Sequence, residues 1–127
     1  MIDLKTIEIC KHQLLTTKAE LLNRFQGHIR DFRERNSGGT GDEADQTSQL
    51  QAEAQMLATQ TMLRKQLFEI ESALARISAG TFGICEETEE PIERDRLLAI
   101  PWTRLSIEGA EIRENHGDEA RLYSGSN

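Results

Sequence analysis

The sequence predicts a mainly α protein, in which a long antiparallel coiled-coil hairpin carries a small globular base and a C-terminal helix. Two long segments without proline carry apolar residues at coiled-coil spacing. A polar, glycine-rich stretch, "ERNSGGTGDEADQTSQ", separates them. After residue 79 the periodicity stops. A polar stretch rich in turn-forming residues follows, and a last helical segment, "SIEGAEIRENH", comes after it.

The first helix is expected at about residues 3–36, with its stripe at positions 4, 7, 11, 14, 18, 21 and 25. Five of these seven positions are apolar, and the others are Lys11 and Lys18, whose stems can cover apolar surface. A second apolar line lies beside this stripe, at Leu15, Leu22 and Ile29. Either broader packing against the other helix, or dimerisation or contact with a partner, explains that line, and the sequence leaves these alternatives open.

The second helix is expected at about 45–79, with its stripe at positions 56, 60, 63, 67, 70, 74 and 77. Helices joined by a short loop fold back antiparallel, so residues 1–79 form the hairpin, with its tip at 37–48. Centring the fold-back on the glycine cluster predicts Phe25 opposite Met56. Residues 80–127 then form the base, with Gly80 as a helix C-cap.

Composition excludes several function classes. A net charge of −7 without a basic cluster argues against direct nucleic-acid binding. No apolar run approaches the roughly 20 residues that span a bilayer, and "MIDLKTIEIC" precedes no small-residue cleavage site, so we expect a cytoplasmic protein without a membrane role. The two cysteines, Cys10 and Cys85, are expected to be thiols. The oligomeric state stays open, with a monomer as the working expectation.

An enzyme is not expected. The chain has no glycine-rich phosphate loop and no nucleophile with a plausible base. Two of its three histidines, His12 and His28, fall on the predicted hairpin, and the third is His116.

Acidic residues mark the predicted tip, at Asp42, Glu43 and Asp45. The dipole at a helix N-terminus favours acids there, which is a purely structural explanation. The functional alternative is that a long hairpin delivers these carboxylates into a cavity that holds a metal ion or basic residues.

The stretch "ALARISAGTFGICEETEEPIERDRLLAIPWTRLSIEGAE", preceded by a hairpin with "DEADQTSQ" at its tip, resembles the DksA/TraR family of bacterial RNA-polymerase-binding transcription factors. The resemblance implies a finger that enters the polymerase secondary channel and regulates initiation within the stringent response. The family tip reads D-x-x-D-x-A, which Asp42 and Asp45 match, while the bulkier Thr47 stands at the alanine position. A coiled-coil adaptor unrelated to polymerase is the alternative from the residues alone.

The base of this family is usually a zinc ribbon with the spacing C-x2-C-x17-C-x2-C. Counting along this chain places the four ligand positions at Cys85, Thr88, Ser106 and Gly109. One thiolate remains where tetrahedral structural zinc needs four Cys or His ligands, so we expect a degenerate ribbon without zinc. Packing of apolar base residues is expected to replace the metal, from Phe82, Ile84, Ile92, Leu97, Leu98, Ile100 and Trp102. Cys85 is then either a leftover buried thiol or a redox sensor.

Family members that respond to the alarmone ppGpp supply basic side chains around the ribbon. The alignment places Glu69, Ile100 and Ala110 at such positions, and only Arg96 matches. Because a glutamate repels a phosphorylated anion, ppGpp synergy is expected to be weak or absent.

Overall fold

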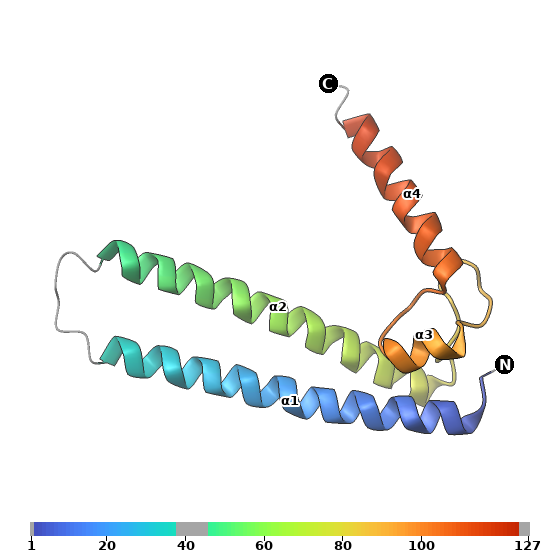
Figure 1. Ribbon diagram of the computed structural model, residues 1–127, viewed down its shortest axis with the longest axis horizontal. Helices are drawn as coiled ribbons and strands as arrows, with labels where there is room; N and C mark the ends of the chain where they lie inside the picture. Colours follow the sequence, from blue (N-terminus) through green and yellow to red (C-terminus); the bar gives the residue numbers. More distant parts are fainter. Residues whose placement is uncertain (1, 38–45, 125–127) are drawn as a thin grey trace. The chain divides into compact units, whose positions relative to one another are not determined.

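The computed structural model describes residues 2–37 and 46–124, with side chains described for 2–35 and 46–117. Figure 1 shows four helices in these ranges, α1 (Leu4–Ser37), α2 (Gln46–Ala79), α3 (Arg94–Ala99) and α4 (Ile107–Ser124). The described residues form no strand, and their one isolated bridge is antiparallel, between Ile84 and Pro91. The predicted mainly α fold is therefore confirmed. The short α3 was not predicted.

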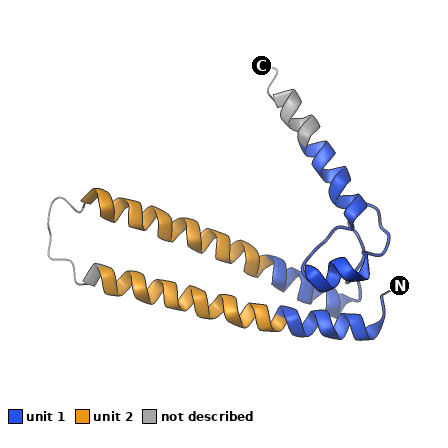
Figure 2. Cartoon of the chain, viewed as in Figure 1, with its two compact units in different colours: residues 1–14, 69–127 blue, residues 15–68 orange. Residues whose placement is uncertain are grey.

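The two long helices begin and end within one residue of the predicted bounds. No helix in the described part of the chain is long and apolar enough to cross a membrane. The chain divides into two compact units, drawn in blue and orange in Figure 2. Unit 1 combines residues 1–14 with 69–127, and unit 2 is residues 15–68. The first turns of α1 and the last turns of α2 thus belong to the same unit as α3 and α4.

Unit 2 contains the pairing of α1 with α2, and its register differs from the predicted one. The predicted α2 stripe is confirmed in this unit, since Met56 and Leu63 are buried. However, Met56 lines a cavity with His28 and Phe32, while Phe25 lines another cavity with Leu63. The sequence predicts Phe25 opposite Met56, but Met56 shares its cavity with His28 and Phe32, so the predicted pairing of these two residues is not reproduced.

The inward face of α1 also differs from the predicted one. In unit 1 the buried positions on α1 are Thr6, Cys10 and Leu14, whereas the predicted seam residues Leu4 and Lys11 are exposed. Burying Cys10 in place of Lys11 leaves the ammonium in water, which avoids the cost of desolvating a charge. The seam predicted on α1 is therefore correct at Leu14 and wrong at these two positions.

The core of unit 1 forms where α3 and the preceding turn cover the ends of the two long helices. Its buried apolar residues are Cys10, Leu14, Ile70, Ala73, Phe82, Cys85, Ile92 and Leu97. Phe82, Ile92 and Leu97 pack as predicted for the base. Ile84 and Trp102 do not, because both side chains are exposed.

Specific caps hold the helix ends of unit 1. The Asp3 carboxylate accepts the backbone N–H of Thr6 at 3.0 Å and caps α1. At the end of α2, Gly80 has a φ of 78°, its N–H donates to Ile77 O, and the N–H of Thr81 donates to Arg76 O. This is a Schellman motif, which confirms the C-cap predicted at Gly80.

Candidate functional site

A tight turn after α2 presents Cys85. The N–H of Cys85 donates to Glu90 O at 2.8 Å, and the N–H of Ile92 donates to Gly83 O at 2.8 Å, which closes a short hairpin. Gly83 has a φ of 84°, and a Cβ there would overlap the side chain of Ile2. Only glycine fits both conditions without strain. The turn therefore aims Cys85 inward, where its side chain is fully buried.

Two hydrogen bonds converge on the sulfur of Cys85. The backbone N–H of Thr88 donates to Sγ at 3.5 Å, and the Ser106 hydroxyl donates to it at 3.4 Å. The Thr88 hydroxyl instead accepts the N–H of Glu90 at 3.3 Å. The serine brings the start of α4 onto a turn that lies 21 residues earlier in the chain.

Ser106 is also the N-cap of α4. Its Oγ accepts the backbone N–H of Gly109 at 3.0 Å, and the N–H of Ala110 donates to Ser106 O at 2.9 Å. One buried hydroxyl thus accepts from the helix and donates to the sulfur. The structure brings Cys85, Thr88, Ser106 and Gly109 together at one place.

The residues at this place do not fit a structural zinc ion. Their donors are one thiol and two hydroxyls, and Gly109 has no side chain. A Cβ added to Gly109 would lie 2.5 Å from the Cys85 sulfur, so this sulfur occupies the space where the fourth ligand's side chain would begin. Among the described residues, no group of three or more His, Cys, Asp or Glu side chains is arranged to hold a metal ion.

The two thiols have different acidities. Burial raises the pKa of Cys85, but hydrogen bonds from Ser106 and Thr88 outweigh it and lower the pKa to about 6. Burial also raises the pKa of Cys10, and this effect is larger than the lowering caused by the nearby charge of Arg94. The Cys10 thiol donates to Leu97 O at 3.6 Å and acts as a core residue. Cys85 is therefore the thiol that ionises near neutral pH.

An ion-pair network surrounds this turn. Arg104 donates to Glu69 on α2 (Nε to Oε2, 3.0 Å) and to Glu86 in the turn (Nη1 to Oε1, 3.1 Å). Arg113 on α4 pairs with Glu86 and Glu87. These bonds link α2, the Cys85 turn and α4, although each pair is partly solvated and individually weak.

Sequence reasoning missed this network. The sequence does contain hints of it. Arg104 comes shortly before the predicted ligand position Ser106, and Arg113 lies about two turns into the last helix. Ion pairing depends on side-chain geometry that spacing alone does not give. Glu69 had been singled out only as a departure at a basic position.

The structure describes only one of the three predicted tip residues. Asp42 and Asp45 lie outside the described residues. Thr47 is the second residue of α2, and its side chain is exposed.

Comparisons with known proteins cover most of the chain. The family described as "Prokaryotic dksA/traR C4-type zinc finger" matches residues 80–115. The RNA polymerase-binding transcription factor DksA of Caulobacter vibrioides is 34% identical over 110 residues, which are 87% of this chain and 77% of the relative. An uncharacterized protein of Aquifex aeolicus is 36% identical over 112 residues, 83% of this chain and 74% of its own length.

A solved structure is similar over almost the whole length. The structure of transcription factor DksA2 from Pseudomonas aeruginosa matches with a TM-score of 0.83 and 32% sequence identity. The match covers 91% of this chain and 88% of the DksA2 chain. The similarity thus includes the long helices as well as the turn around Cys85.

Proposed function

The chain belongs to the DksA/TraR family, and on this premise we propose that it is a transcription regulator that binds RNA polymerase directly and not through DNA. The observation that carries the proposal is the near full-length match to DksA2, together with relatives that include a polymerase-binding DksA. The net charge of −7 agrees with a protein partner, because phosphates would repel the chain as a whole. The site of action is the cytoplasm, and the working form is a monomer.

The hairpin enters the secondary channel of polymerase in this proposal and acts through its tip. Support comes from two helices of 34 residues on either side of the segment that contains Asp42 and Asp45. At about 1.5 Å per residue, each helix is roughly 50 Å long, which is enough to reach deep into a channel. Thr47, exposed in the first turn of α2, is bulkier than the alanine of the family pattern and weakens the tip's action.

The base works without zinc. The buried bond from Ser106 to Cys85 and the cap on Gly109 support this proposal, because they occupy the place that a metal would need. The Arg104 network adds links between the same elements.

Synergy with ppGpp is weak or absent. Glu69 stands at a position where responsive relatives carry a basic residue. It forms an ion pair with Arg104, which makes that guanidinium less available to a bound anion. Arg96, the matching base, donates through Nε to Leu105 O at 2.8 Å. An anion would have to compete with these contacts and with the repulsion from Glu69 and Glu86.

In vitro transcription from a ribosomal-RNA-type promoter tests the proposal. The wild-type protein is expected to change initiation, and the double variant Asp42→Asn, Asp45→Asn is expected to bind polymerase but lose most of that effect. Addition of ppGpp is expected to change the wild-type effect less than about twofold. Equal activity of the wild type and the double variant refutes the tip role, and a large ppGpp gain refutes the alarmone inference.

Direct binding to core polymerase separates this function from that of an unrelated coiled-coil adaptor. The purified protein is expected to bind core polymerase without sigma factor or DNA. If no complex forms at micromolar concentrations of both components, the polymerase proposal fails and the adaptor hypothesis gains.

A further inference from the structure

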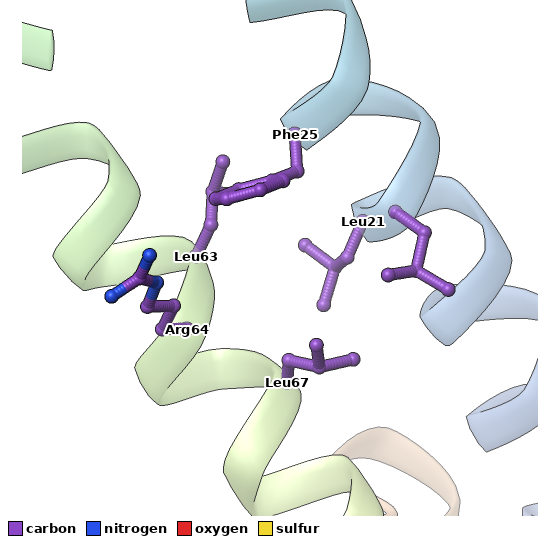
Figure 3. Close-up of a pocket in the computed structure, with 6 residues that line it drawn as sticks. Leu21, Phe25, Leu63, Arg64 and Leu67 are labelled. Atoms are coloured by element: carbon purple, nitrogen blue, oxygen red, sulfur yellow. The ribbon is translucent and has the colours of Figure 1, made fainter. Parts of the chain in front are cut away.

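Unit 2 carries an apolar groove on one side of the α1–α2 pair. Figure 3 shows its lining from both helices, which consists of Leu21, Leu22, Phe25, Leu63, Arg64 and Leu67. Its volume is about 290 Å³, near the lower end of the roughly 300–1,000 Å³ of small-molecule sites. A single guanidinium is the only charged group in the lining. The groove therefore suits one anchoring side chain of a partner better than a cofactor.

The apolar surface extends beyond the groove. Leu22 is 39% exposed, and Leu15, two turns earlier on the same face of α1, is 47% exposed. On α2, Phe68 follows Arg64 by about one turn and is 65% exposed. The leucine line predicted on the first helix is thus not fully covered by α2. Apolar residues that share a face with a groove indicate an interaction surface more strongly than scattered ones do.

The charge of this face is opposite to that of the protein. The guanidinium carbon of Arg64 lies 6.0 Å from the centroid of the Phe25 ring, at the edge of the groove. Lys18 precedes Leu22 by four residues and so shares its face of α1. Residues 57–68 contain no acid, and Glu20, the one acid in 15–29, is two residues from Lys18 and faces elsewhere. A basic rim on a chain of net charge −7 complements a negatively charged partner.

We propose that this groove, flanked by Arg64, takes an apolar side chain of RNA polymerase that lies beside a carboxylate. The inference rests on the proposed function and gives polymerase a second contact, on the shaft of the hairpin and separate from the tip. A second copy of the chain fits less well. A two-fold interface would place the same face on both sides, so that Arg64 and Lys18 would oppose like charges.

A pair of charge reversals tests the electrostatic part. Arg64→Glu and Lys65→Glu alter the net charge equally, and both side chains are exposed, but adjacent residues lie about 100° apart around a helix. Arg64→Glu is expected to weaken binding to core polymerase about tenfold, and Lys65→Glu less than about twofold. The difference in polymerase affinity between the two variants is expected to become smaller at high salt, where the charges are screened.

A second pair tests the apolar part. Leu22→Gln removes a groove side chain, whereas Met62→Gln removes one that is 56% exposed and absent from the groove lining. Leu22→Gln is expected to weaken polymerase binding about fivefold or more, and Met62→Gln about twofold at most, with both variants retaining the wild-type circular dichroism spectrum. If the circular dichroism spectrum shows that Leu22→Gln is not folded, the comparison of Arg64→Glu with Lys65→Glu alone tests the groove.

The outcomes separate the groove from the proposed function. If the wild type binds polymerase but Arg64→Glu and Lys65→Glu behave alike, only the groove inference is overturned. If the wild type does not bind at all, both are overturned. If sedimentation shows a dimer that Arg64→Glu dissociates, the occupant is a second copy and the polymerase assignment is overturned.

Discussion

Removing the Ser106 hydroxyl is expected to destabilise the protein through two losses at once. Ser106→Ala removes the N-cap of α4, which costs about 1 kcal/mol. It also removes the hydroxyl that donates to Cys85 Sγ at 3.4 Å inside the core, which costs about another 1 kcal/mol. An alanine fits the space, so no steric clash adds to these losses. The free energy of unfolding is therefore expected to fall by about 2 kcal/mol.

This loss translates into a measurable melting shift. At roughly 2.1 cal/mol/K per residue, a chain of 127 residues unfolds with an entropy of about 270 cal/mol/K near its midpoint. A loss of about 2 kcal/mol then lowers the Tm by about 7 °C. Thermal unfolding followed by circular dichroism measures this shift directly.

Thr88→Ala is the matched control, because it also removes one hydroxyl from a ligand position. The Thr88 hydroxyl accepts the exposed N–H of Glu90, and the backbone N–H of Thr88 still donates to Cys85 in the variant. Its Tm is expected to fall by only about 2 °C. A Ser106→Ala protein that melts within about 2 °C of the wild type would show that Ser106 does not hold the base together.

Three further predictions concern the same unit. The pKa of Cys85, about 6, lies below the roughly 8.5 of an unfolded thiol, so its stabilisation is complete above about pH 8.5 and lost as the pH falls through about 6. Cys85→Ser should flatten the pH dependence of Tm over that window, and an unchanged slope would exclude the thiolate as its source. Gly83→Ala, at a positive φ and against Ile2, is expected to cost about 2 kcal/mol in denaturant unfolding, whereas Gly117→Ala in open space on α4 should stabilise by about 0.5 kcal/mol. A metal chelator should leave the Tm of the protein unchanged, and a chelator-dependent loss of fold would restore a structural metal to the base.

The helices were predictable from the sequence because their signals are local. The stripe on α2 at Met56, Leu63 and Ile70 is buried as its spacing predicts, and Gly80 ends the helix. Periods, caps and breakers act over a few residues and need no tertiary information. The predicted bounds are accordingly off by no more than one residue.

The register between the helices was not predictable in the same way. Apolar residues recur every three or four positions along α1, so spacing alone does not decide which of them lies opposite Met56. Centring the fold-back on the glycine cluster assumes that equal numbers of residues separate the loop centre from each pair of facing residues. The face of α1 that turns inward near its start also differs from the prediction, because Cys10 is cheaper to bury than the charged Lys11.

Counting residues places Ser106 and Gly109 at two of the ligand positions that the family spacing predicts, but does not give the contacts that they make. The absence of a side chain at Gly109 lets the first turn of α4 approach the Cys85 sulfur, and the Ser106 hydroxyl forms one hydrogen bond to that sulfur and one to the helix. A cysteine restored at Gly109 would have to displace either that sulfur or the helix. The residues at these positions therefore depend on one another, and a zinc site here would require rebuilding the start of α4 as well as adding thiols.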